Sequence, residues 1–250
     1  MDATHAVLGL DGCPGGWVCA RWDGSTGLVL ERHAHLADVF TLPWLQAAID
    51  MPLGLPDQAG PGGRAPEPLV RPLLGMRQSS VFSVPSRAAV EAGGDAAIPV
   101  EERYAVACRV ARETSVPPRA VSKQAFHIFP KILEADALMR SRPGLRLAEC
   151  HPEVSFWAMN GRQPLALPKK VKSAPFAAGL ELRIALLAAQ GVPVAQLTRA
   201  HARALGAGLD DLVDACACAW TASRIAKGTA LAFPNPPHAD RHGVPVAIWA

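Results

Sequence analysis

VLGLDGCPGGWV, residues 7–18, places an apolar run, a Gly/Pro-rich turn and the start of a second apolar run in immediate succession. The second run continues to Trp22, so the pattern predicts a β-hairpin whose first strand ends on Asp11. A carboxylate in an apolar strand costs free energy unless it has a partner. That partner could be a hydrogen bond, a basic side chain or a metal ion, and its nature bears on what the protein does.

The composition is typical of a soluble globular protein, with 50% hydrophobic and 19% charged residues. A chain of 250 residues can bury one sizeable core, or one core with a large insertion. No run of about 18 apolar residues occurs, so we expect no transmembrane helix. Residues 1–5 show no basic region ahead of an apolar stretch, so we expect no signal peptide and a cytoplasmic location.

The six cysteines show no metal or redox spacing. None stands in a Cys-x-x-Cys pair, which disfavours a zinc ribbon or a redox motif. Cys216 and Cys218 lie in an Ala-rich helical pattern, where free cysteine packs as a small apolar side chain. We therefore expect all six to be structural.

The net charge of +3 is unevenly distributed. Residues 1–60 hold two basic against seven acidic side chains, a net charge of −5, whereas residues 119–183 hold eleven against five, a net charge of +6. An acidic cluster facing a basic surface suits a metal site that serves a polyanion. Solvated charged faces on a mixed surface explain the same distribution equally well.

The order of predicted elements indicates one α/β domain over residues 1–250. Strands at 6–11, 16–22 and 27–32 would form an antiparallel three-strand meander in a mixed sheet. Further strands are predicted at 47–52, 146–150, 229–233 and 244–249, and helices at 36–46, 101–113, 121–141, 174–190, 195–204 and 209–227. These helices would cover both faces of the sheet. The Gly/Pro/Arg-rich segment 54–100 has little periodicity and is interpreted as a long functional loop or insertion.

Four acidic side chains are candidate metal ligands. Asp11 and Asp50 each end an apolar strand, and neighbouring strands would bring both carboxylates to one sheet edge. Asp211 and Asp214 lie three residues apart on one helix face. Hard divalent cations such as Mg²⁺ and Mn²⁺ take such oxygen ligands, and paired ions can activate water for phosphodiester cleavage. The sequence thus suggests a site for Mg²⁺ or Mn²⁺ in which these four acids are both ligands and catalytic groups.

Simpler roles exist for several acids. Asp210 is expected to be the N-cap of the helix at 209–227, and Asp211 favours the helix dipole. Asp214 is poorly explained in this way, because small residues suited to close packing follow it and an acid facing a packed sheet needs a cation. Glu153 is a further catalytic candidate after the strand at 146–150, with Glu149 as a less favoured neighbour.

Several polar side chains are candidates for substrate binding. Lys123, Lys131 and Lys170 could hold phosphate as point charges, or they could belong to solvated faces. His151 could act as a general base or ligand, or belong to a polar turn. Ser79 has no Gly-x-Ser-x-Gly context, which disfavours a serine hydrolase and leaves a substrate-binding role. The glycines at 12–16 open a hairpin and not a helix, which disfavours a Rossmann nucleotide site.

Motifs in fixed order along nearly the whole chain resemble a known family. They are GLDGCPGGW (9–17), IDMPLGLP (49–56), SSVF (79–82), SKQ (122–124), PKILE (130–134), HPE (151–153), KK (169–170) and DDLVDA (210–215). Together they resemble the family catalogued as domain of unknown function 429, whose members are regarded as predicted nucleases with an RNase H-like fold.

The resemblance implies roles for the acids. RNase H-like folds carry one acid on the first strand, one on the fourth and one or two on the last core helix, which correspond here to Asp11, Asp50 and Asp214 with Asp211. The Asp-x-x-Asp-Ala sequence at 211–215 is similar to the closing motif of Holliday-junction resolvases of this fold. Those resolvases usually carry Glu where this chain has Asp50, and a minimal RNase H-like domain lacks the segment 54–100. A Mg²⁺- or Mn²⁺-dependent nuclease acting on nucleic acid is therefore expected.

Two other functions stay open on the sequence. One is a nucleotide-binding phosphotransferase of the actin and sugar-kinase type, although those proteins carry a Gly-rich hairpin in each of two related domains and this chain shows one. The other is a non-catalytic binding protein on the same fold. The choice between DNA and RNA, the cleavage mode and the oligomeric state, a homo-oligomer included, are not determined by the sequence.

Overall fold

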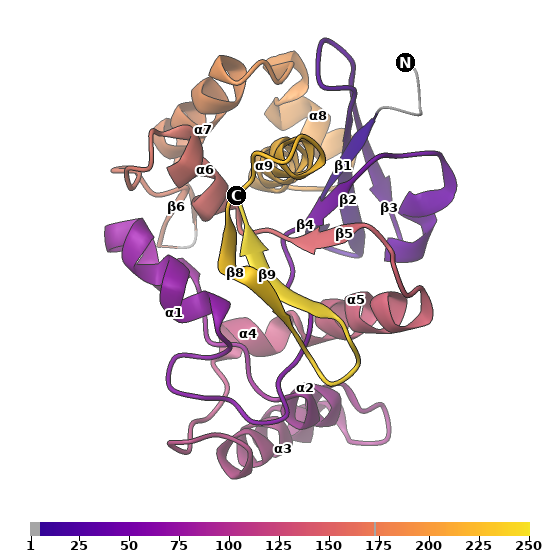
Figure 1. The fold of residues 1–250 in the computed structure, drawn as a ribbon, viewed down its shortest axis with the longest axis vertical. Coiled ribbons are helices and arrows are strands. Elements are labelled where there is room, and N and C mark those ends of the chain that lie inside the picture. Colours follow the sequence, from indigo (N-terminus) through magenta and orange to yellow (C-terminus); the bar gives the residue numbers. More distant parts are fainter. Residues whose placement is uncertain (1–5, 173) are drawn as a thin grey trace.

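The computed structural model describes residues 6–172 and 174–250 (Figure 1). Residues 1–5, on which the expected absence of a signal peptide rests, lie outside this range. Among the helices of the described part, none combines the length and the apolar character needed to cross a membrane.

A mixed five-stranded sheet forms the centre of the fold, in the order β3-β2-β1-β4-β5. Its strands are β1 (Val7–Cys13), β2 (Gly16–Trp22), β3 (Leu28–His33), β4 (Ala47–Ile49) and β5 (Leu147–Glu149). The first three pair as an antiparallel meander, whereas β4 runs parallel to β1 and β5 parallel to β4. The predicted α/β class, the mixed sheet and the meander are confirmed.

The first strand extends two residues beyond its predicted end. Asp11 pairs with Val18 inside the hairpin, and pairing continues to Cys13 and Gly16. The turn is therefore only two residues long, and Gly15 adopts the left-handed φ of 67° that it requires. Asp11 is thus a residue within the strand and not its last one.

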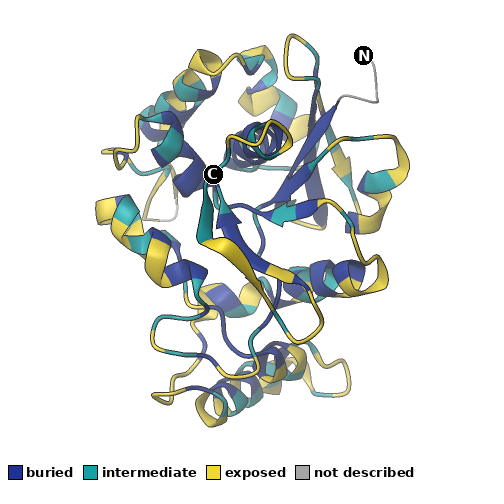
Figure 2. Ribbon diagram, viewed as in Figure 1, coloured by how far each residue is buried: buried dark blue, intermediate teal, exposed yellow. Residues whose placement is uncertain are grey.

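Helices cover both faces of the sheet, as predicted (Figures 1 and 2). One face packs against α6 (Pro152–Met159), α7 (Ala177–Ala189), α8 (Arg199–Ala204) and α9 (Leu209–Ala226). The opposite face packs against a layer formed by η2 (Leu36–Thr41), α2 (Arg87–Gly94), α3 (Val100–Glu113), α4 (Lys123–His127) and α5 (Phe129–Ser141). Because side chains alternate along a strand, Leu8 and Leu10 enter the second layer whereas Val7 faces the first.

Prolines change two predicted helices. The helix predicted over 121–141 is divided into α4 and α5 at Ile128, since Pro130 in the first turn of α5 has no N–H for a continuous helix. The helix predicted over 36–46 is only the short 3₁₀ helix η2. It ends at Thr41, because the next residue, Leu42, has the extended backbone that is favoured before Pro43.

The segment 54–100 is more regular than its composition suggests. It contains α1 (Pro66–Val70), the 3₁₀ segment η3 (Arg71–Ser80) and α2, so its interpretation as a loop was wrong in part. The predicted final strand pair is present as β8 (Ala232–Ala239) and β9 (Pro245–Trp249), and it lies beside β5. Short elements complete the described chain: β6 (Lys170–Val171), β7 (Ala174–Pro175) and η4 (Val194–Gln196).

Candidate metal centre

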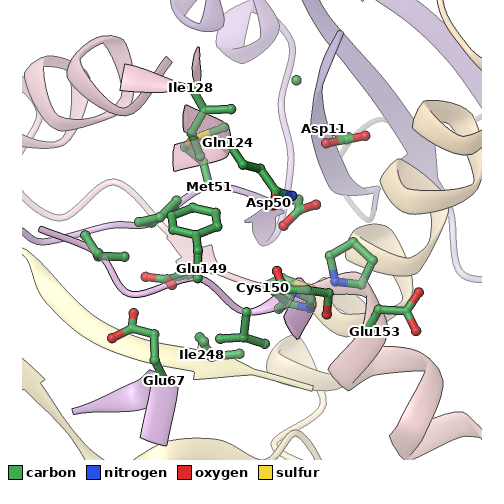
Figure 3. A pocket seen from close by; sticks show the side chains of 18 of the residues that line it. Asp11, Asp50, Met51, Glu67, Gln124, Ile128, Glu149, Cys150, Glu153 and Ile248 are labelled. Carbon is green, nitrogen blue, oxygen red and sulfur yellow. Dashed lines mark hydrogen bonds between the residues drawn. The ribbon is translucent and has the colours of Figure 1, made fainter. Parts of the chain in front are cut away.

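Three carboxylates from separate parts of the chain converge beside the sheet. Asp11 lies on β1, Asp50 follows β4 directly, and Asp214 lies in the second turn of α9. One oxygen from each lies within 4.8 Å of the others. We call these three residues the carboxylate cluster. Figure 3 shows Asp11 and Asp50 on the same side of the cleft.

Strand periodicity and one glycine bring α9 to these acids. Asp11 faces the same side of the sheet as Gly9, and α9 crosses that side. A Cβ atom on Gly9 would lie 2.0 Å from the carbonyl oxygen of Ala215, so the bare glycine lets the helix approach the strand directly. Asp214, the neighbour of Ala215, is thereby held beside Asp11.

The carboxylate cluster is poorly satisfied by hydrogen bonds. Asp11 is 8% exposed and Asp214 only 2%. Within residues 6–172 and 174–250, the buried Oδ1 atom of Asp214 has no hydrogen-bond partner. A buried oxygen of this kind costs free energy unless a cation or donor reaches it.

Burial and mutual repulsion raise the pKa values of the cluster. The pKa of Asp11 lies well above its usual value, first because of burial and then because Asp50 and Asp214 are close. Burial likewise raises the pKa of Asp50 to about 6, against an opposing effect of His151, and raises the pKa of Asp214. Ionising the cluster without a cation is therefore unfavourable.

A lysine supplies one positive charge. The Nζ atom of Lys169 forms an ion pair with Oδ2 of Asp214. Burial lowers the pKa of Lys169, but Asp214, Asp11 and Asp50 outweigh this effect and the net shift is upward. The sequence placed Lys169 in a family motif without giving it a site role, because nothing local indicates which acid a lysine will meet.

The other two acids of the DDLVDA motif have different partners. Asp211 accepts a hydrogen bond from the backbone N–H of Gly208 at 2.8 Å and so caps α9. The N-cap residue is Gly208, so the expected N-cap role of Asp210 was wrong. Asp210 instead pairs with Nζ of Lys170 at 2.6 Å. Asp211, predicted as a metal ligand, is not part of the carboxylate cluster.

Glu153 lies at the cleft but is already paired. Both of its carboxylate oxygens accept hydrogen bonds from the guanidinium of Arg183, at 2.6 to 3.0 Å. Arg183 is fully buried and Glu153 is 5% exposed. This pairing favours a positioning role for Glu153 over the predicted catalytic one.

Most of the predicted substrate-binding residues line one cleft of about 720 Å³, which is also lined by Asp11 and Asp50 of the carboxylate cluster. They are Lys131, Lys170, Ser79 and His151, and Lys169 joins them. Nζ of Lys131 donates to the carbonyl oxygen of Gly16 and lies 4.4 Å from the centre of the Trp17 ring. Lys123 is exposed on α4 and is not among the residues that line this cleft.

The family described as "Protein of unknown function (DUF429)" matches residues 9–239. The chain belongs to this family. No curated protein and no solved structure matches the chain. The match confirms the family resemblance in the sequence, and it includes all three acids of the carboxylate cluster.

This DUF429 protein also has a buried ion network that the sequence did not reveal. Arg64 binds both oxygens of Glu149, at 2.9 and 2.5 Å, and also binds Glu67. Glu149 further accepts from the backbone N–H of Leu53 at 2.8 Å. Glu67 and Glu149 lie across the cleft from Asp11 and Asp50 (Figure 3). The network anchors the start of the segment 54–100 to β5, so that this segment forms a wall of the cleft.

Proposed function

We propose that this protein is a nuclease that hydrolyses a phosphodiester bond of nucleic acid and depends on Mg²⁺ or Mn²⁺. The observation that carries the proposal is the carboxylate cluster, with oxygens of Asp11, Asp50 and Asp214 within 4.8 Å of one another. The unpartnered Oδ1 atom of Asp214 adds to it, because a buried carboxylate oxygen without a donor is a ready ligand for a cation.

The charge and chemistry of the donor set fit a divalent ion. Three ionised carboxylates carry a formal charge of −3, of which the ammonium of Lys169 neutralises one in the metal-free protein. Hard divalent cations prefer carboxylate oxygens, and Mg²⁺ typically retains waters and phosphate oxygens beside a few carboxylates. Asp11, Asp50 and Asp214 would hold the ion. When bound, it supplies a water of lowered pKa and neutralises charge on the phosphate.

The topology supports an RNase H-like assignment. The three acids lie on the first strand, after the fourth strand and on the long helix α9, in a sheet of order β3-β2-β1-β4-β5. This is the distribution that the family resemblance implies. Asp211 then supports the site as the cap of α9, and Glu153 supports it through Arg183.

The cleft suits a polyanionic substrate. Lys131 and Lys170 lie along it as point charges that can contact phosphate, and Ser79 and His151 add polar atoms.

We propose a cytoplasmic location as well, because all six cysteines are buried and none is in a disulfide, which fits a reducing compartment.

A non-catalytic binding protein is the second candidate. The ion pair between Lys169 and Asp214 favours it, since a lysine can neutralise part of the carboxylate cluster without any metal. Such a protein would bind its ligand in the same cleft without cleaving it.

Asp11→Asn separates the two candidates. We expect the wild-type protein with Mn²⁺ to cleave single-stranded or structured nucleic acid, and the variant to lose at least about a hundredfold in rate. The amide keeps the shape of the side chain, so circular dichroism and thermal unfolding should report a folded variant. Asp95→Asn is the matched control, because Asp95 is exposed. An inactive wild-type protein across DNA, RNA and branched substrates would contradict nuclease activity.

A further inference from the structure

Lys169 enters the carboxylate cluster from outside the sheet and α9. It belongs to the segment between α6 and α7, and its side chain is 29% exposed although its ammonium pairs with the buried Asp214. Nζ thus contacts Oδ2 of the same carboxylate whose unpartnered Oδ1 is available to a divalent ion, and the charges of Asp11 and Asp50 also act on it. Two cations on the two oxygens of one carboxylate repel each other.

The backbone that carries Lys169 is firmly held. Arg183 donates from Nη1 to the carbonyl oxygen of Leu167 at 3.1 Å, and the backbone N–H of Phe176 donates to the carbonyl oxygen of Lys169 at 2.8 Å. A Cβ atom on Gly179 would lie 1.7 Å from the carbonyl oxygen of Pro168, so α7 lies directly against this segment. The backbone around Lys169 is therefore held in place, whereas the long, partly exposed side chain of Lys169 can move.

We propose that Lys169 is an exchangeable counter-ion: its ammonium neutralises Asp214 in the metal-free protein, leaves when the carboxylate cluster binds a divalent ion, and then contacts the phosphate of the substrate. This inference rests on the proposed function. The cleft gives the released ammonium a place to go, since Lys169 lines it together with Lys131 and Lys170.

The neighbouring lysine forms a comparable ion pair that does not involve the carboxylate cluster. Lys170 pairs with Asp210, which lies outside the carboxylate cluster, and its side chain is 47% exposed. Both lysines connect the same segment to α9. If Lys169 only attached this segment to α9, removing it would leave the affinity for a metal ion unchanged, as we expect for the removal of Lys170.

The test is a Mn²⁺ titration by calorimetry on the full chain. Replacing Lys169 by Met removes the competing charge, so we expect Lys169→Met to bind Mn²⁺ about tenfold more tightly than the wild type. Lys169→Arg keeps the charge, and Lys170→Met leaves the cluster intact, so both should stay within about twofold of the wild type. Lys169→Ala repeats the test if the Met variant does not fold.

Activity at saturating Mn²⁺ provides the second readout. Loss of the phosphate contact should lower kcat/KM of Lys169→Met about tenfold, while Lys170→Met changes it less. Unchanged or weaker Mn²⁺ binding by Lys169→Met, with normal binding by the wild type, would overturn the inference and leave the proposed function standing. Binding by Lys169→Met alone would support the exchange and overturn metal dependence of the wild type. If neither binds Mn²⁺, both proposals fail.

Discussion

A carboxylate within an apolar strand ordinarily requires a hydrogen-bond donor, but Asp11 lies beside two other acids, Asp50 and Asp214. Its pKa is raised by burial and by Asp50 and Asp214, and the positive charge that partly offsets this effect comes from Lys169. The position is maintained because Gly9, two residues earlier, lets α9 press against β1. At the scale of single residues, the site therefore depends as much on a missing side chain as on the acids.

Gly9→Ala tests this close approach. The new Cβ would lie 2.0 Å from the carbonyl oxygen of Ala215 and 2.1 Å from the backbone nitrogen of Ala219, both on α9. Backbone atoms of a packed helix cannot yield locally, so we expect the free energy of unfolding to fall by about 3 kcal/mol or more. Urea denaturation measures the change.

Gly12→Ala is the control for this substitution on the same strand. Its Cβ would meet Cδ of Lys131 at 2.6 Å, which is part of a flexible side chain that can shift. We expect a loss of about 1 kcal/mol or less. Equal losses for the two variants would show that the approach of α9 is not the critical contact.

The acids of the site could be predicted from the sequence, but their basic partners could not. Asp11 and Asp50 stand out because an apolar strand carries each, and Asp214 because small residues follow it. Arg64, Arg183 and Lys169 lie in stretches without such contrast. Arg64 lies 85 residues from Glu149, Arg183 lies 30 from Glu153, and Lys169 lies 45 from Asp214. No local pattern encodes which of these distant acids a basic side chain will meet.

At the scale of elements, the face on the α9 side is held together by a buried ion pair. Arg183 on α7 binds Glu153 on α6, and the same guanidinium binds the carbonyl oxygen of Leu167. A single arginine thus fixes two helices and the segment that carries Lys169.

Elements with strong periodicity were predicted closely from the sequence. The helix predicted at 209–227, for example, is α9 (Leu209–Ala226) in the structure. In the segment 54–100, long-range contacts determine the structure and periodicity is weak.

Arg183→Met should destabilise the protein strongly. It would leave the carboxylate of Glu153 buried and without its partner, which typically costs about 3 to 5 kcal/mol. Urea denaturation should show this loss. The double variant Glu153→Gln with Arg183→Met removes both charges and should recover part of it, because a buried pair is costly mainly when one member is left alone. A single variant as stable as the wild type would contradict this role of the pair.

At the scale of the whole molecule, the carboxylate cluster links stability to pH and to metal. The central sheet and α9 bring three acids together, and Asp11 and Asp50 line the cleft of which the segment 54–100 forms a wall. Folding must therefore bury carboxylates close to one another. This cost is largest when the acids are ionised and no divalent ion is present.

Asp50→Asn measures this cost. Burial raises the pKa of Asp50 from 3.8 to about 6, so the folded state binds its proton more readily than the unfolded chain does. The penalty is absent below about pH 4, grows as the pH rises to about 6 and is constant above that value. In a metal chelator, we expect Asp50→Asn to raise the free energy of unfolding by about 1 to 2 kcal/mol at pH 8 and to change it little at about pH 4. Thermal and urea unfolding at both pH values check the sign.

Adding Mn²⁺ at pH 8 should stabilise the wild type more than the Asp50→Asn variant, because the variant lacks one ligand. Asp95→Asn, on the surface, should show neither effect, and a gain for Asp50→Asn that is equal at both pH values would contradict the ionised cluster as its source.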